Sequence, residues 1–252
     1  MTNDNIIDAI INNISKVDII DEPFGHMFIQ NIFPEDFYNE LLDSIPKKKD
    51  YTAINKTKTV ASNYSDERFI FNFTDEKVLN KLTENQKNFF NKLTKIMFSN
   101  KLFESITLSF KKIIDNNIHN MTREDKSKFG FPNLKFGFRT ALIKDLTQYS
   151  LGAHTDGIFK FITFLFYIPS TDELVKNGTA LYKPKNEITG SKHFSLEETR
   201  KNFLKIKTCP FIPNSVLIFP RTARSFHGVE EVNINKKERN LLLLNYNFIE
   251  SK

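Results

Sequence analysis

The second half of the chain is a series of short apolar runs separated by turn residues, and this pattern restricts the possible folds most. The runs are rich in Val, Ile, Phe, Tyr and Thr, which favour β-strands. They cover residues 135–142, 159–168, 180–182, 215–219, 226–230 and 239–248. In the first half, apolar residues recur at helical spacing, within 4–17, 75–98 and 101–118. Helices followed by strands predict an α+β chain.

The length of the chain suits one large domain. Its 252 residues are 40% hydrophobic and 26% charged, which is typical of a globular protein. Since no linker or repeat divides them, we predict a single domain over residues 1–252. We expect a mainly helical part at 1–134 to pack outside a strand-rich core at 135–250, with loops at 47–72 and 120–133.

Composition excludes several classes of partner. No apolar run approaches the ~20 residues of a membrane span, and the polar start does not resemble a signal peptide. A single cysteine, Cys209, fits a reducing compartment, so we expect a cytoplasmic protein. The net charge is +6, but no nucleic-acid motif accompanies it, so we expect a small-molecule partner and no nucleic acid. The sequence does not indicate an oligomeric state.

One short motif carries the side chains of a metal site. In His154-Thr155-Asp156 an imidazole and a carboxylate lie two residues apart, and on a strand such residues point to the same face. His227 lies within the strand-like run 226–230. Two histidines and one carboxylate are the ligand set of non-haem Fe(II) oxygenases, which leaves positions open on the metal. We therefore predict that His154, Asp156 and His227 bind one metal ion.

An arginine follows at the start of the last apolar run. If His227 and Arg239 lie on adjacent antiparallel strands joined by residues 232–238, both side chains can face the interior. A guanidinium forms a two-pronged bridge to a carboxylate. Arg239 is therefore predicted to hold a carboxylate whose parent molecule also reaches the metal.

These residues together resemble a known family, the Fe(II)/2-oxoglutarate-dependent dioxygenases, and especially its bacterial prolyl-hydroxylase-like branch. The resemblance rests on His154-x-Asp156, on 213–219, on Ser225-Phe-His227-Gly-Val229 and on Arg239, and residues 23–36 resemble the opening of that branch. It implies a double-stranded β-helix, or jelly-roll, core. It also implies an oxidoreductase with Fe(II) as cofactor and with 2-oxoglutarate and O₂ as cosubstrates.

The same resemblance assigns two further residues to the 2-oxoglutarate pocket. Tyr167 occupies the position from which family members direct a tyrosine hydroxyl to a cosubstrate carboxylate, and Thr163 would share its face of the strand. Many members carry Ser or Thr two residues after the arginine, where this chain has Leu241. Asp156 argues against the halogenase variant of the family, which needs a small residue at that position.

Several polar residues near the predicted inner strands or their mouth are candidates for binding substrate. They are Arg139, Tyr149, Lys160 and Arg224, and Arg221 also lies beside His227. Arg139 stands within an apolar strand and needs a partner, which can be a substrate carboxylate or an internal ion pair. We expect the insert 170–210, which contains His193, to shape the entrance.

Four functions follow as hypotheses. The first is hydroxylation of a small polar metabolite, such as an amino acid, a sugar derivative or a biosynthetic intermediate, with release of succinate and CO₂. The second is hydroxylation of a peptidyl residue of the prolyl type. The third is a jelly-roll metalloenzyme of another kind, using Zn or Mn, and the fourth is a binding module without catalysis. The sequence does not separate hydroxylation from desaturation or ring formation.

Overall fold

The structure, a computed structural model, describes residues 1–57, 65–188, 193–233 and 237–251. The helices are α1 (Asn3–Ile14), α2 (Glu35–Ser44), α3 (Glu76–Leu79), α4 (Glu84–Met97), α5 (Asn100–Ser109), α6 (Lys111–His119), α7 (Arg123–Lys128) and α8 (Leu196–Asn202). The strands are β1 (Met27–Gln30), β2 (Thr52–Ala53), β3 (Arg68–Phe71), β4 (Phe136–Asp145), β5 (Leu151–His154), β6 (Lys160–Tyr167), β7 (Thr179–Pro184), β8 (Phe203–Cys209), β9 (Ser215–Pro220), β10 (His227–Val229) and β11 (Arg239–Phe248).

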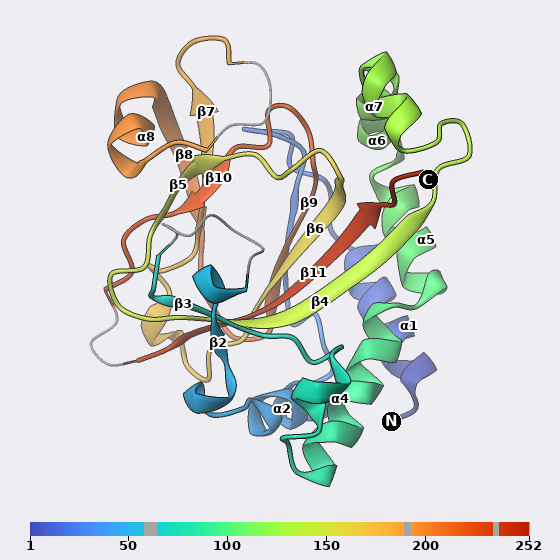
Figure 1. Ribbon diagram of the computed structural model, residues 1–252, viewed down its shortest axis with the longest axis vertical. Helices are drawn as coiled ribbons and strands as arrows, with labels where there is room; N and C mark the ends of the chain where they lie inside the picture. The colour runs from blue at the N-terminus through green and yellow to red at the C-terminus, as the bar shows by residue number, and fades with distance from the viewer. Residues whose placement is uncertain (58–64, 189–192, 234–236, 252) are drawn as a thin grey trace.

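The strands form two antiparallel sheets. The larger sheet has seven strands in the order β1-β9-β6-β11-β4-β3-β2, and the smaller has four in the order β5-β10-β7-β8. From β4 onward the chain passes repeatedly from one sheet to the other, which is the strand order of a jelly roll (Figure 1). Over the described residues the two sheets stay separate and do not close into a barrel.

The six predicted strands correspond to β4, β6, β7, β9, β10 and β11. Three other expectations are wrong. Residues 47–72 are not only a loop, because β2 and β3 extend the large sheet. Residues 170–210 are not an insert, because β7 and β8 form half of the small sheet, and residues 120–133 contain α7. Elements such as β2 and α7 are too short to show a period, and pairing with β4 and β7 stabilises β3 and β8 respectively.

Helices cover one face of the large sheet. Helix α1 begins where the Thr2 hydroxyl accepts a hydrogen bond from the Asn5 N–H at 3.3 Å, and it buries four isoleucines. These isoleucines belong to the same hydrophobic cluster as residues of α4, α5, β6 and β11. Figure 1 shows α1, α4 and α5 beside the large sheet, on the side away from the small sheet.

The other face of the large sheet looks toward the small sheet. Along β11, alternate residues serve the two faces, as expected for a strand. Leu242, Leu244 and Tyr246 belong to the helix-side cluster. Arg239, Leu241, Leu243 and Asn245 line a cavity that residues of the small sheet also line. This alternation places polar side chains of the large sheet between the two sheets.

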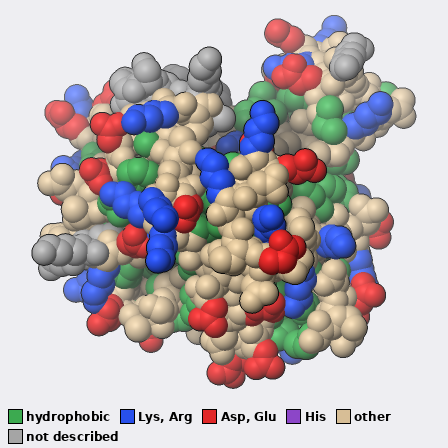
Figure 2. Space-filling view, turned by 60° about the horizontal axis from the view of Figure 1, so that its bottom comes forward, with side chains coloured by type: hydrophobic (Ala, Val, Ile, Leu, Met, Phe, Trp, Pro, Cys, Tyr) green, Lys and Arg blue, Asp and Glu red, His purple; other side chains and the backbone are tan. Residues whose placement is uncertain are grey.

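The surface carries mixed charges. Lys and Arg side chains are interspersed with Asp and Glu side chains over the face seen in Figure 2. Within the described parts of the chain, we find no helix whose length and apolar character would let it cross a bilayer.

Candidate metal centre

His154, Asp156 and His227 meet at the edge of the small sheet. His154 ends β5 and His227 begins β10, and the two residues are directly paired across these strands. Their ring centroids lie 4.2 Å apart. Each of the three residues offers one ligand atom, and these atoms lie within 4.8 Å of one another. Asp156 lies beyond the end of β5, so the expectation that His154 and Asp156 share a strand is only half right.

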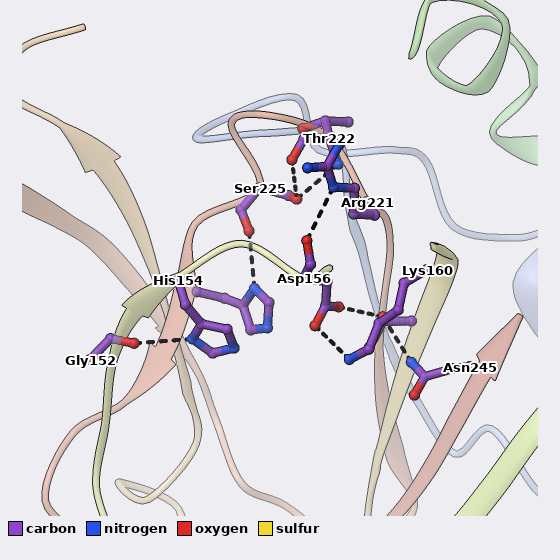
Figure 3. Close-up of polar contacts among 10 residues, drawn as sticks. Gly152, His154, Asp156, Lys160, Arg221, Thr222, Ser225 and Asn245 are labelled. Atoms are coloured by element: carbon purple, nitrogen blue, oxygen red, sulfur yellow. Dashed lines mark hydrogen bonds and ion pairs between the residues drawn. The ribbon is translucent and has the colours of Figure 1, made fainter. Parts of the chain in front are cut away.

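Backbone carbonyls orient both imidazoles. The Nδ1 atom of His154 lies 3.0 Å from the Gly152 carbonyl oxygen (Figure 3). The Nδ1 atom of His227 lies 3.0 Å from the Ser225 carbonyl oxygen. Because a carbonyl only accepts, each Nδ1 must carry the proton, which leaves Nε2 with a free lone pair. Burial lowers the pKa of both imidazoles, and for His154 the neighbouring His227 lowers it further. Both rings are therefore neutral and ready to bind a metal.

The Asp156 carboxylate is held at both oxygens. Lys160 donates to Oδ1 and the Thr163 hydroxyl donates to Oδ2, each at 2.6 Å. Burial alone would raise the pKa of Asp156, but the ammonium group of Lys160 beside it opposes this effect, and the pKa of Asp156 lies well below its usual range. The carboxylate is therefore charged and fixed in orientation.

Arg221 contacts the backbone of Asp156. Its side chain is buried, and its Nε donates to the Asp156 backbone carbonyl at 3.1 Å (Figure 3). The sequence placed Arg221 only beside His227, among the candidates for binding substrate. The structure instead gives it a contact that fixes the backbone of a predicted metal ligand.

Replacing Thr163 with valine is expected to weaken metal binding about 10- to 100-fold, the usual cost of losing a hydrogen bond that orients a ligand. Valine keeps the shape and removes the hydroxyl on Asp156. Anaerobic titration with Fe(II), or with Mn(II), measures the affinity. Thr208→Val, on β8 and away from the cavity, is the control. Equal affinities of the two variants would show that the hydroxyl does not position Asp156.

The three predicted ligands lie at the wall of a cavity of about 330 Å³ between the sheets. Its size is within the range of small-molecule sites. Apolar side chains from both sheets form much of the wall, including those of Ile70, Ile143, Leu165, Val229, Leu241 and Leu243. The cavity therefore combines a polar metal-binding corner with apolar side chains along much of its wall.

Two arginines and an aspartate form a row across the large sheet beside this cavity. Arg68 on β3, Asp145 on β4 and Arg239 on β11 are direct cross-strand partners. The Asp145 carboxylate accepts from Arg239 Nη1 at 2.5 Å and from Arg68 Nε at 2.6 Å. Arg239 and Asp145 are fully buried, and both arginines line the cavity. Sequence reasoning missed Arg68 and Asp145, because strand register alone brings them together.

One atom of Arg239 lacks a partner. Its Nε donates to the Asn177 carbonyl at 2.6 Å and its Nη1 bonds Asp145, but Nη2 is buried with no hydrogen-bond partner among the described residues. A buried donor without an acceptor is costly. A ligand carboxylate in the cavity would satisfy it. The residues present therefore fit both a metal and an acid with two distant acidic ends.

The predicted route from His227 to Arg239 needs a correction. They do not lie on adjacent strands, because β10 belongs to the small sheet and β11 to the large sheet. Both nevertheless line the cavity from opposite sides. The segment 232–238, which was predicted to join the two strands directly, lies partly outside the described residues.

Tyr167 and Thr163 were predicted to face one pocket, but of the two only Thr163 is among the described residues that line the cavity. The Tyr167 side chain is fully buried, its hydroxyl accepts from the Thr179 N–H at 3.3 Å, and it is not among the described residues that line the cavity. Thr163 lines the cavity and contacts Asp156. Leu241 also lines it. The roles assigned to Tyr167 and Thr163 in cosubstrate binding stay predictions.

The candidate substrate residues separate into two groups. Arg139 and Lys160 line the cavity, as does His193, whose ring stacks on that of His154 with centroids 4.9 Å apart. Tyr149 is fully buried beneath the Arg68 guanidinium, and Arg224 is exposed; neither is among the residues lining the cavity. Residues 189–192 of the expected entrance segment lie outside the described residues.

No protein-family model matches the sequence, and no curated protein matches it either. Solved structures do match. The epimerase SnoN, solved with Fe³⁺, alpha ketoglutarate and nogalamycin RO, aligns with a TM-score of 0.50 at 9% identity, over 96% of this chain and 83% of SnoN. A Pseudomonas putida prolyl-4-hydroxylase aligns with a TM-score of 0.48 at 10% identity, over 96% of this chain and 98% of the other.

A third structure is the Trichoplax adhaerens prolyl hydroxylase in complex with a hypoxia inducible factor peptide. It aligns with a TM-score of 0.43 at 14% identity, over 97% of this chain and 90% of the other. The SnoN alignment shows that the two chains share a fold. The resemblance to Fe(II)/2-oxoglutarate-dependent dioxygenases is thereby confirmed at the level of fold, and the reaction has to be argued from the residues.

Proposed function

We propose that the protein is an Fe(II)- and 2-oxoglutarate-dependent dioxygenase that hydroxylates an unactivated C–H bond of a small polar metabolite. One O₂ and one 2-oxoglutarate are consumed for each C–H bond converted to C–OH. The products are the alcohol, succinate and CO₂, so one oxygen atom enters the substrate and the other enters succinate.

One observation carries the proposal. The ligand atoms of His154, Asp156 and His227 face a cavity whose opposite wall holds Arg239, with its unpartnered Nη2. Two imidazoles and a carboxylate suit Fe(II) and leave coordination positions open. A guanidinium suits the far carboxylate of 2-oxoglutarate. A site that bound only a metal would not require a buried arginine with an unpartnered Nη2 on the other side of the cavity.

The side chains have separate tasks in this reaction. His154 and His227 present Nε2 to the metal, and Asp156 presents a carboxylate that Thr163 and Lys160 orient. Bound iron would supply the activation of O₂, which no side chain can perform. Arg239 holds the far end of 2-oxoglutarate over Leu241 and Leu243, whose apolar side chains exclude water from that part of the cavity.

The size of the cavity supports a small substrate, since about 330 Å³ must also hold 2-oxoglutarate. The alternative, hydroxylation of a peptidyl residue, needs only one side chain to enter. We further propose that residues 1–252 act as one domain. In support, β1, β2 and β3 from the first part join the sheet that contains β4 and β11.

The proposal predicts slow succinate release when aerobic protein is mixed with Fe(II) and 2-oxoglutarate, and faster release with the right substrate. A metabolite library, supplemented with proline-containing peptides, is screened for succinate and for a product that is heavier by one oxygen atom. A peptide as the best stimulator would favour the peptidyl alternative. Succinate at the level of the protein-free control, with every compound, would refute the proposal.

The same assay separates the remaining hypotheses. A Zn- or Mn-dependent hydrolase or isomerase would convert its substrate without consuming O₂ or 2-oxoglutarate. A binding module would bind a compound without changing it, and its affinity would not depend on His154. Coupled loss of O₂ and gain of succinate is therefore the decisive measurement.

A further inference from the structure

The cavity contains one cation that the described residues do not neutralise. Arg68 and Arg239 share the Asp145 carboxylate, and Lys160 pairs with Asp156 at 2.6 Å. Arg139 also lines the cavity and is partly buried, but it makes no ion pair or hydrogen bond with any described residue. Burial lowers the pKa of Arg139, yet a guanidinium stays protonated in proteins. It therefore holds a positive charge that has no partner among the residues that the structure describes.

The rest of the chain offers no hidden carboxylate side chain for Arg139. Residues 58–64, 189–192, 234–236 and 252, which the structure does not describe, include neither Asp nor Glu. Of the two possibilities that the sequence left open for Arg139, an internal ion pair and a ligand anion, the first thus lacks a partner.

A second buried group lies beside Arg139. Asn245 is its direct cross-strand partner on β11, is fully buried and lines the same cavity. The Thr163 hydroxyl gives its proton to Asp156, so it must accept from the Asn245 amide nitrogen, which lies 3.0 Å away. This network fixes the orientation of the amide, and it leaves Asn245 Oδ1 buried without a partner among the described residues.

The position of this pair differs from that of the predicted cosubstrate anchor. Asn245 and Arg239 lie six residues apart on β11, a backbone distance of about 20 Å. The row Arg139–Asn245–Thr163 crosses β4, β11 and β6 at the end that contacts Asp156. The row Arg68–Asp145–Arg239 crosses the sheet at the other end. Two sites for anions can therefore coexist, with the metal-binding corner nearer to the Arg139 row.

Charge leads to the same conclusion. Four cationic side chains of the described residues line the cavity, namely Arg68, Arg139, Lys160 and Arg239, and only the Asp145 and Asp156 carboxylates pair with them. Fe(II) and the dianion of 2-oxoglutarate would together add no net charge. A positive cavity therefore remains after both are bound, and it favours an anionic third ligand.

We propose that Arg139 and Asn245 form a second anion site, which binds the carboxylate or phosphate end of the substrate. This inference rests on the proposed function. The guanidinium of Arg139 pairs with the anionic group. The free carbonyl oxygen of Asn245 accepts a hydrogen bond from an O–H or N–H of the same molecule. The substrate class is therefore a small acid or phosphate ester that carries a hydroxyl or amino group.

The first test uses anions as probes. Wild-type protein is titrated with Mn(II) and 2-oxoglutarate, and then acetate or inorganic phosphate is added at constant ionic strength while thermal unfolding is followed. We expect saturable stabilisation, with an apparent affinity at least about tenfold weaker in Arg139→Gln, because a charge-assisted contact is lost. Arg139→Lys, which keeps the charge, should recover part of it. Arg123→Gln, the same change at an exposed position at the start of α7, away from the cavity, should behave as wild type.

The outcomes separate the two proposals. Failure of the wild type to bind Mn(II) and 2-oxoglutarate would refute the proposed function. Normal binding of both, with the same probe affinity in wild type and Arg139→Gln, would overturn the second anion site alone. Probe anions that displace 2-oxoglutarate, and do not bind beside it, would also overturn it.

The second test uses pairs of compounds in the succinate assay, each acid or phosphate ester beside its amide or its dephosphorylated form. The anionic member should stimulate succinate release at least about tenfold more strongly than the neutral member. A neutral compound that stimulates release as well as its anionic partner would overturn the assignment of substrate class.

Discussion

Replacing His154 with alanine is expected to abolish 2-oxoglutarate-dependent succinate release, and so is replacing Asp156 with alanine. Each variant removes one of the three predicted metal ligands. Loss of an outer hydrogen bond to a metal ligand already costs about 10- to 100-fold in affinity or activity, so loss of a ligand should cost more than about 100-fold. Succinate release with Fe(II), together with Mn(II) titration, measures both effects.

The controls separate loss of metal from loss of fold. His119→Ala changes a histidine that lies exposed at the end of α6, and it should keep wild-type activity. Asp156→Ala leaves the Lys160 ammonium without its partner, so Asp156→Asn, which keeps the side-chain shape, is measured beside it. A His154→Ala variant with wild-type succinate release would contradict the assignment of the metal site.

Asp145→Ala is expected to have the largest effect on stability. It leaves Arg239 fully buried and Arg68 largely buried without their shared carboxylate. Removing one partner of a buried ion pair costs about 3–5 kcal/mol. For a chain of this size each kcal/mol lowers Tm by about 2–4 °C, so Tm should fall by roughly 10 °C. Chemical denaturation and thermal unfolding both measure the change in the free energy of unfolding.

The matched control is Asp115→Ala. Asp115 pairs with Lys111 on the surface of α6, where both side chains are more than half exposed. Exposed pairs of this kind contribute well under about 1 kcal/mol, so Tm should hardly change. If Asp145→Ala and Asp115→Ala lowered the free energy of unfolding equally, the two-arginine row would not be a stabilising element.

The local sequence was enough to predict most strands of the core and to propose the residues of the metal site. The runs that became β4, β6 and β9 combine β-branched and aromatic residues, and the run that became β11 has four consecutive leucines followed by two aromatic residues, so their own composition identifies them. For the metal site, His154-x-Asp156 is a weak signal by itself, and only the addition of His227 in its apolar run and of Arg239 makes a chance arrangement improbable. Geometry then refined the picture, because Asp156 proved to lie beyond the strand that ends at His154.

Contacts between distant segments could not be read in the same way. Asp145 meets Arg68 and Arg239 only because β3 and β11 flank β4 in a particular register. A shift of one residue would turn these side chains to the helix-covered face. The pairing of Arg139 with Asn245 has the same origin. The sequence identified Arg139 as a cation that needs a partner, and the strand register places Asn245 beside it.

The contact between Lys160 and Asp156 has a consequence for the life of the protein. In many small metalloproteins the ligands repel one another until the ion arrives, so folding waits for the metal. Here an ammonium group already neutralises the carboxylate, and both imidazoles are neutral. The chain can therefore reach its native state first and acquire iron afterwards. Removal of the ion by a chelator should return the protein to this folded form, from which it can be loaded again.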